Sequence, residues 1–219
     1  MLRLLTANLL FDHADTASFA RLLDEASPDV VALQELGADV ASAVAERFPY
    51  HDLRPTDDSR GMGMAARHRA SFDLIPMPHH DALVAEVEDG PRIVSVHVSN
   101  PVEPPFVEPN RRRRIQVRAL LDDIDGSRGT LVVAGDFNAS PMWPAYRRIT
   151  EVLDDAVVQA VGKRQARRLK TWGPRLIGGR RVLRIDHVFV RGLRGVDARV
   201  VPVRGSDHAA VVVDLEETA

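Results

Sequence analysis

The sequence predicts an α/β protein in which two mixed β-sheets pack face to face, with helices on their outer sides. Three observations predict this class. Strand and helix patterns alternate early in the chain, short strand patterns separated by turn residues fill the middle, and helical patterns occur in both halves. This mixture of alternation and hairpins fits two mixed sheets that share a core and are covered by helices.

The first fifty residues predict alternating strands and helices. The expected elements are buried strands at residues 2–10 and 30–33 and helices at residues 16–26 and 37–48. Thr16 or Ser18 is the expected N-cap of the first helix, because short polar side chains accept hydrogen bonds from free N–H groups.

The rest of the chain predicts hairpins, then longer helices, then strands. Strands are expected at residues 61–67, 71–76, 82–88, 92–98, 130–134, 183–190, 195–203 and 209–215, and helices at residues 108–125 and 144–160. Pro101 to Pro109 is expected to be a proline-rich loop. In the helix that follows it, Ile115, Ala119, Leu120 and Ile124 fall on one side.

Length and composition limit the function classes. The 219 residues are 45% hydrophobic, which suits a single globular domain over residues 1–219. The net charge of -2 excludes a polycation that binds nucleic acid or membrane by bulk charge. The absence of cysteine excludes disulfides, thiolate zinc sites and cysteine nucleophiles.

The N-terminal apolar stretch, Met1 to Phe11, is too short to span a bilayer and lacks a signal-peptide cleavage pattern. It is better explained as a strand, and no other window is long enough to span a membrane. We therefore expect a cytoplasmic monomer without a transmembrane segment. Peripheral contact with a membrane surface stays open.

Polar side chains that suit metal binding and acid–base chemistry occur at or beside the predicted strands. They are Asn8, Gln34, Glu35, His97, Asp136, Asn138, Asp186, His187, Asp207 and His208. Carboxylate and amide oxygens are the ligands that Mg²⁺ prefers, and histidine beside carboxylate is a common acid–base arrangement. Each residue alone is more often structural: a buried hydrogen-bonded polar group, a helix cap or a turn. Together and in this order they exceed what independent coincidence explains, which indicates one polar site for metal binding and acid–base chemistry.

The motifs also resemble a known family. They are Thr6-Ala-Asn8, Leu33-Gln-Glu35, Val96-His97, Gly135-Asp-Phe-Asn-Ala139, Arg184-Ile-Asp-His-Val188 and Gly205-Ser-Asp-His208. This set resembles the endonuclease/exonuclease/phosphatase superfamily, to which deoxyribonuclease I belongs. The resemblance spans residues 6 to 208 and implies a four-layered αββα sandwich with two mixed sheets. It also implies hydrolysis of a phosphate ester by activated water.

The resemblance assigns a metal site to three residues. Glu35 is implied as the principal ligand of Mg²⁺ or Mn²⁺, with Asn8 and Asp207 completing the protein's share. A hard cation held there polarises a phosphoryl oxygen. Whether one or two ions act stays open.

The resemblance also implies catalytic roles for the remaining polar residues. Asp136 orients or deprotonates the attacking water, and Asn138 donates to a phosphate oxygen. His97 contacts the phosphate or protonates the leaving group, while His208 is the second catalytic histidine and Asp186 its partner. The sequence leaves open whether Asp136 or His208 is the general base.

The other histidines are expected to be structural. His187 follows Asp186, so it should point to the opposite face of the sheet. Asp12 and His13 are expected in a solvated loop. His51, His68, His79 and His80 have no chemical neighbours in the sequence.

Two basic segments bear on the substrate. Arg111 and Arg114 begin a helix near the expected site, and residues 162–184 contain nine Lys or Arg, no acidic residue and Trp172. Arginine with tryptophan suits nucleic-acid stacking and phosphate contact, an anionic lipid surface, or only a solvated hairpin. Arg111, Arg114 and Trp172 are therefore candidate substrate-binding residues.

The function classes that remain are three. The first is a phosphodiesterase acting on nucleic acid or on a small or lipid phosphodiester. The second is a phosphomonoesterase acting on a sugar or lipid phosphate. The third is a catalytically inactive binding module, which the full set of polar residues disfavours.

Overall fold

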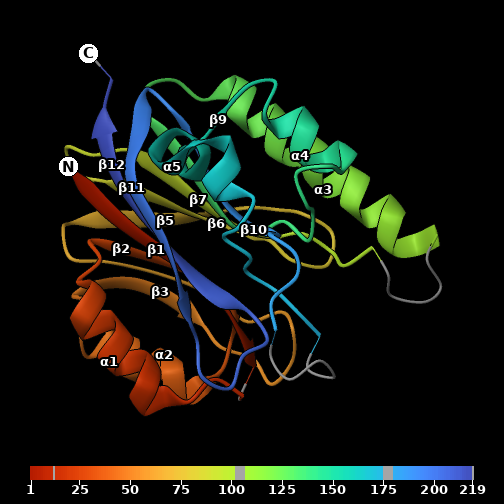
Figure 1. The fold of residues 1–219 in the computed structure, drawn as a ribbon. Helices are drawn as coiled ribbons and strands as arrows, with labels where there is room; N and C mark the ends of the chain where they lie inside the picture. The colour runs from red at the N-terminus through yellow and green to blue at the C-terminus, as the bar shows by residue number, and fades with distance from the viewer. Residues whose placement is uncertain (12, 102–106, 175–179, 219) are drawn as a thin grey trace.

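The computed structural model describes residues 1–11, 13–101, 107–174 and 180–218. Two six-stranded sheets pack face to face, with helices on the outer side of each (Figure 1). The predicted α/β sandwich with two mixed sheets is therefore confirmed. No helix within the described residues is long and apolar enough to cross a membrane.

The first sheet contains both chain ends. Its strands, in spatial order, are β11 (Leu193–Pro202), β12 (Ala209–Glu217), β1 (Leu2–Phe11), β2 (Val30–Leu36), β4 (Met62–Ala66) and β3 (Tyr50–Arg54). β1 and β2 are parallel, and every other pair is antiparallel. The parallel pair places the C-terminal ends of β1 and β2 at one edge of the sheet.

The second sheet repeats this arrangement. Its strands, in spatial order, are β5 (Ala70–Ile75), β6 (Ala82–Val87), β7 (Arg92–His97), β8 (Leu131–Asp136), β10 (Asp186–Arg191) and β9 (Asp154–Asp155). β7 and β8 form its parallel pair. Because β10 is antiparallel to β8, Asp186 at its start pairs with Asp136 at the end of β8.

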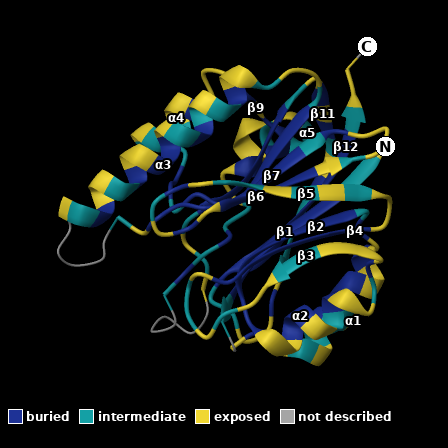
Figure 2. Ribbon diagram, turned by 180° about the vertical axis from the view of Figure 1, so that it is seen from behind, coloured by how far each residue is buried: buried dark blue, intermediate teal, exposed yellow. Residues whose placement is uncertain are grey.

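Helices cover the outer faces of both sheets (Figure 2). The helices α1 (Thr16–Ala26) and α2 (Ala38–Ala45) pack on the first sheet, and α3 (Val107–Gly126) and α4 (Pro144–Ile149) pack on the second. The helix α5 (Ala156–Ala166) packs against β11 and β10, which come from different sheets. It covers the apolar core at the margin between the sheets.

The central strands are buried on both faces. Successive residues of β1 illustrate this: Leu4 belongs to the core between the sheets, whereas Leu5 packs under α1 and α2. Side chains of a strand alternate between its faces, so a strand covered on both sides has a continuous apolar sequence. This is why the runs at residues 2–10 and 30–33 predicted buried strands correctly.

Several local expectations were wrong. Asp15, and neither Thr16 nor Ser18, is the N-cap of α1, and its carboxylate accepts from the Ser18 N–H at 2.8 Å. β3 was not predicted, because this edge strand is polar and largely exposed. Ile115 is 43% exposed and does not join the buried side of α3.

The predicted helix at residues 144–160 is two helices separated by a short strand. α4 ends at Ile149, and Asp155 caps α5 by accepting from the Val158 N–H at 3.0 Å. The expected proline-rich loop is shorter than Pro101–Pro109, because α3 already begins at Val107. Residues 102–106 of that loop lie outside the described residues.

We expect Gly135→Ala to destabilise the protein strongly, because Gly135 has a φ of 139° and an added Cβ would lie 2.0 Å from the Val96 carbonyl oxygen. Backbone strain and overpacking together predict a loss of about 3–5 kcal/mol in the free energy of unfolding. Gly129→Ala is the matched control, since Gly129 has a φ of 80° with open space around it. Its free energy of unfolding, measured in urea, should fall by about 1–2 kcal/mol. Equal losses in both variants would contradict the proposed clash.

Candidate active site

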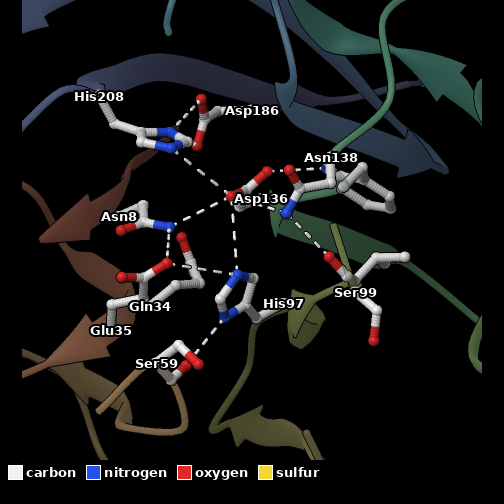
Figure 3. Close-up of polar contacts among 12 residues, drawn as sticks. Asn8, Gln34, Glu35, Ser59, His97, Ser99, Asp136, Asn138, Asp186 and His208 are labelled. Carbon is white, nitrogen blue, oxygen red and sulfur yellow. Dashed lines mark hydrogen bonds and ion pairs between the residues drawn. The ribbon is translucent and has the colours of Figure 1, made fainter. Parts of the chain in front are cut away.

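Side chains from both sheets meet at the edge where the parallel strands end (Figure 3). The Asn8 amide on β1 donates to Glu35 Oε1 at 2.9 Å and to Asp136 Oδ2 at 3.1 Å. The Asn8 oxygen accepts from the Leu10 N–H at 3.0 Å, which fixes the orientation of the amide. Asn8 therefore links a carboxylate of the first sheet to a carboxylate of the second.

A histidine–aspartate pair lies on the other side of Asp136. His208 Nδ1 lies 3.0 Å from Asp186 Oδ2, and His208 Nε2 lies 3.7 Å from Asp136 Oδ2. The loop before β12 is fixed to β1, because Ser206 Oγ donates to the Asn8 carbonyl at 2.8 Å and accepts from the His208 N–H. Both ring nitrogens of His208 thus face carboxylates.

His97 lies on the third side of the same group. Its Nε2 is 3.6 Å from Glu35 Oε1 and 3.7 Å from Asp136 Oδ2, while its Nδ1 lies 3.2 Å from the Ser59 carbonyl oxygen. The ring of His80 stacks on the ring of His97, with centroids 4.3 Å apart. His80 was expected to be structural only, yet it is buried in direct contact with a candidate catalytic residue.

The residues that carry the site have strained backbones. Glu35 has a φ of 49° and Asn138 a φ of 47°, a region that non-glycine residues seldom adopt. Asn138 contacts Asp136 twice: its N–H donates to Oδ1 at 2.7 Å and its amide to Oδ2 at 3.3 Å. The same amide donates to the Val98 carbonyl at 2.9 Å. The turn after β8 therefore holds the Asp136 carboxylate in one orientation.

Arg113 supports this turn from α3. Its guanidinium is buried and donates to the carbonyl oxygens of Ser99, Phe137 and Asn138 at 3.1, 3.3 and 2.8 Å. Burial lowers the pKa of Arg113 to about 10, so the side chain stays charged at neutral pH. Arg113 belongs to the run of arginines from Arg111 to Arg114, and nothing in the sequence distinguished it from its neighbours.

Burial shifts the acids and bases of the site in different directions. Burial raises the pKa of Glu35 from 4.5 to about 7, against the hydrogen bond from Asn8. It also raises the pKa of Asp136, against the charge of His208. Burial lowers the pKa of His208, but Asp186 and Asp136 outweigh it and the net pKa is raised well above its usual range. Burial lowers the pKa of His97, which is therefore neutral.

Two carboxylate oxygens fit a hard cation. Glu35 Oε2 and Asp207 Oδ1 are buried and have no hydrogen-bond partner within the described part of the chain. The negative charge of Asp207 also contributes to the raised pKa of Glu35. An unpaired buried carboxylate oxygen is costly unless a proton or a cation neutralises it.

A second set of close ligand atoms comes from Asp136, Asp186 and His208, which lie within 4.8 Å of one another. The hydrogen bond between His208 and Asp186 explains most of this proximity without an ion. The carboxylate oxygens that lack a partner belong to Glu35 and Asp207, so Glu35 and Asp207 fit a cation better than this second set.

A pocket of about 520 Å³ opens onto these residues. Its lining contains Glu35, His79, His80, His97, Asp136, Asn138, Trp172, Asp207 and His208. Trp172 Nε1 donates to Asp207 Oδ2 at 3.0 Å, so the indole orients a candidate metal ligand as well as lining the pocket. Arg111 and Arg114, the other candidate substrate-binding residues, do not line this pocket.

The basic segment 162–184 divides into different environments. Arg184 is buried and pairs with Asp155 at 2.8 Å, so it is structural. Arg181 lies beside the site and donates to the His208 carbonyl at 3.1 Å. Lys163, Arg164, Arg167 and Arg168 are exposed on or just after α5. Residues 175–179 lie outside the described residues.

The remaining histidines lie mostly where the sequence placed them. His187 is buried on the opposite face from the pocket, where it contacts Tyr146 and its Nε2 lies 2.8 Å from the Ala139 carbonyl oxygen. His13 is exposed, and Asp12 lies outside the described residues. Only His79 and His80 differ, because both line the pocket.

Comparison with known proteins gives the family. The model of the endonuclease/exonuclease/phosphatase family matches residues 5–208. Two UPF0294 proteins, from Yersinia pseudotuberculosis and Yersinia pestis, are each 33% identical over 103 residues, or 46% of this chain. The match covers 35% of those relatives, so the aligned part is about a third of their length.

Solved structures share the fold over the whole chain. A 3′ phosphatase, NExo, from Neisseria bound to a product DNA hairpin has a TM-score of 0.77 at 20% identity and covers 99% of this chain and 100% of its own. TDP2 from D. rerio, complexed with a single-strand DNA product, has a TM-score of 0.77 at 18% identity and covers 98% of both chains. The family match spans every residue that lines the catalytic pocket, and the chain therefore belongs to the endonuclease/exonuclease/phosphatase family.

Proposed function

We propose that this protein is a metal-dependent phosphodiesterase that hydrolyses its substrate with an activated water molecule. The observation that carries the proposal is the position of Asp136. This buried carboxylate lies 3.7 Å from both His97 and His208 and is linked by Asn8 to Glu35, which has an unpaired oxygen. A proton acceptor, a cationic imidazole and a cation site are thus within reach of one phosphate.

Glu35 and Asp207 would hold Mg²⁺ or Mn²⁺, and the predicted ligand Asn8 would contribute after its oxygen leaves Leu10. When bound, such an ion polarises a phosphoryl oxygen and stabilises the charge that develops on it. The pKa shifts support Asp136 as the group that takes the proton of water, because its raised pKa suits a general base near neutral pH.

His208 is better suited to stabilise charge than to accept a proton. Asp186 and Asp136 keep its imidazole protonated at neutral pH, so it presents a positive charge to a phosphate. Neutral His97 can contact the phosphate or the leaving oxygen. Asn138 would donate to the phosphate by giving up its long 3.3 Å contact with Asp136.

The substrate we favour is a nucleic-acid phosphodiester. The support comes from the neighbours that are described with bound DNA, NExo and TDP2, and from Arg181 beside the site. A phosphomonoester is the second candidate, because NExo is described as a 3′ phosphatase. Small and lipid phosphodiesters remain as outcomes of the experiment below.

We expect the purified protein to nick supercoiled plasmid and to hydrolyse bis(p-nitrophenyl) phosphate in Mg²⁺ or Mn²⁺. Asp136→Asn and His208→Ala should lower kcat by about 10²–10⁴-fold, since each removes a proton acceptor or a positive charge from the reacting phosphate. His51→Ala is the matched histidine control, because His51 is exposed, does not line the pocket, and its Nδ1 lies 2.9 Å from the Phe48 carbonyl oxygen. Hydrolysis of the small diester without nicking would favour a small substrate.

Turnover that persists unchanged in Asp136→Asn, His208→Ala and Glu35→Ala would contradict the proposed function, because the activity would then come from a contaminating enzyme. That result would leave the inactive binding module as the better explanation. Release of phosphate from a 3′-phosphorylated oligonucleotide, without cleavage of the diester, would support the phosphomonoesterase instead.

We expect stabilisation by Mn²⁺ to increase with pH. Glu35 has a folded pKa of about 7, above its ordinary 4.5, so its own contribution to the stability of the metal-free protein falls as pH rises between these values. The cation requires the deprotonated carboxylate and so acts in the opposite direction. The midpoint temperature of thermal unfolding should rise by about 5–10 °C at pH 8 with the ion at roughly 100 times its dissociation constant. At pH 5 the rise should be much smaller.

Glu35→Gln is the control for this experiment. The variant keeps the size and polarity of the side chain but loses the charge, so its thermal unfolding should respond little to Mn²⁺ at either pH. An equal rise at pH 5 and pH 8, or a full rise in Glu35→Gln, would exclude Glu35 as the principal ligand.

His80 is expected to act as a positioning residue for His97. His80→Ala should lower kcat about 10-fold with little change in KM, because the loss of the stacked ring frees the His97 imidazole to move. His80→Phe keeps an aromatic ring at 4.3 Å from His97 and should restore most of the activity. A role in proton transfer would instead leave His80→Phe as impaired as His80→Ala.

A further inference from the structure

A second hollow lies next to the catalytic pocket, between α3 and α4, which pack side by side (Figure 1). Its volume is about 880 Å³. Pro101 and Trp143 line both this groove and the catalytic pocket, so the two hollows are adjacent. A substrate that extends from the catalytic pocket past Trp143 would therefore meet the groove.

The groove has an apolar wall with basic residues on it. Val107, Val117 and Ala145 contribute apolar surface, and Trp143 is half-buried at the junction with the pocket. The Arg113 guanidinium lies 5.5 Å from the Trp143 ring centroid, which holds the indole in a defined place. A pre-positioned aromatic ring suits stacking with a planar group.

Two arginines in the groove are available to an anion. Arg114 on α3 and Arg148 on α4 are exposed and line the groove. Neither forms an ion pair with any residue in the described ranges, unlike Arg112 and Arg118 on the same helix. Arginine without a partner on the protein is well placed to bind phosphate oxygens.

We propose that the groove between α3 and α4 is a substrate subsite for a single-stranded nucleic acid, with a base against Trp143 and backbone phosphates on Arg114 and Arg148. This inference rests on the proposed function, since the scissile phosphate lies in the adjoining pocket. An aromatic ring beside basic side chains is the arrangement that binds single strands without sequence preference. In a duplex the base faces are already stacked and cannot use Trp143.

The charge pattern argues against other occupants. A small diester has nothing to place in the groove once its phosphate occupies the pocket. A lipid with a single phosphate uses the apolar wall but gives Arg114 and Arg148 no second phosphate. A polynucleotide strand provides both a planar group and a phosphate at every residue, which matches the alternating chemistry of the groove.

The test is binding of a 5′-fluorescein-labelled pentathymidylate, followed by fluorescence anisotropy in EDTA, so that metal-dependent turnover does not interfere. Arg114→Ala/Arg148→Ala should bind about 10-fold more weakly than the unaltered protein. The slope of log Kd against log salt should fall by about 1.4, the value for the loss of two phosphate contacts on a single strand.

The matched control removes two positive charges from the same helices outside the groove. Arg118→Ala/Arg147→Ala serves this purpose, because Arg118 and Arg147 are exposed and do not line the groove. This variant should bind almost as tightly as the unaltered protein. Equal weakening in both double variants would overturn the proposal in favour of general charge attraction.

Trp143 provides an independent test. Trp143→Leu should weaken binding several-fold, whereas Trp143→Phe should keep most of it, because phenylalanine still stacks. Thermal unfolding of each variant checks that α4 remains folded. Equal affinity in the leucine and phenylalanine variants would exclude stacking at this position and overturn the placement of the base.

Hydrolysis separates the failure of this inference from the failure of the proposed function. Loss of kcat/KM in Arg114→Ala/Arg148→Ala should be at least about 5-fold greater for the pentanucleotide than for bis(p-nitrophenyl) phosphate. Equal losses would overturn the subsite while leaving the phosphodiesterase in place. Groove-dependent binding without any metal-dependent hydrolysis would overturn the proposed function, and with it a subsite for a substrate.

Discussion

The contact between Asn8 and Asp136 joins the two sheets at the candidate active site. Asp136 lies at the end of β8 in the second sheet, and its Oδ2 accepts from Asn8 of the first sheet at 3.1 Å. Deeper between the sheets, Gln34 of β2 donates to Ser95 Oγ of β7 at 3.1 Å. Buried polar contacts of this kind fix one relative position of the sheets, because any slip leaves a donor or acceptor unpaired. The carboxylates and imidazoles of the site depend on that position.

Several features that destabilise a folded protein occur together at the candidate active site. Glu35 and Asn138 have positive φ values, and buried oxygens of Glu35 and Asp207 have no partner in the described part of the chain. Strain and unpaired polar atoms each cost on the order of 1–3 kcal/mol and persist only where the surroundings impose them. The surroundings here are two apolar cores that cover both faces of the strands. A site of this kind persists because apolar packing along the rest of each strand holds the strand in place.

The strong signals in the sequence reflect burial, so they predicted two mixed sheets covered by helices but did not fix the strand order. Strands such as β2 and β8 are covered on both faces, so their sequences are largely apolar and carry polar residues at or near their C-terminal ends. β3 was missed because an edge strand has no such pattern. The break before α5 was missed because the two-residue strand β9 is defined by its pairing with Phe189 and Val190, far along the chain.

The polar motifs at the strand ends predicted which residues would lie near the site, but they did not predict its supporting residues. Ser59, His80 and Arg113 come from loops and from an arginine-rich helix, where the sequence gives no periodic or spacing signal. Their positions follow from tertiary packing alone. The left-handed backbone of Glu35 has the same origin, since glutamate has no intrinsic preference for that conformation.

Arg113 connects the catalytic pocket to the groove beside it. Its guanidinium donates to the carbonyl oxygens of Phe137 and Asn138, directly after Asp136, and also lies against the Trp143 ring. No carboxylate in the described residues lies within ion-pair distance of Arg113, so carbonyl dipoles carry the compensation for its burial. Those carbonyls are held in place in return, because a buried guanidinium that loses acceptors costs several kcal/mol. One buried side chain therefore contacts both the Trp143 ring of the groove and the backbone of the turn that carries Asn138.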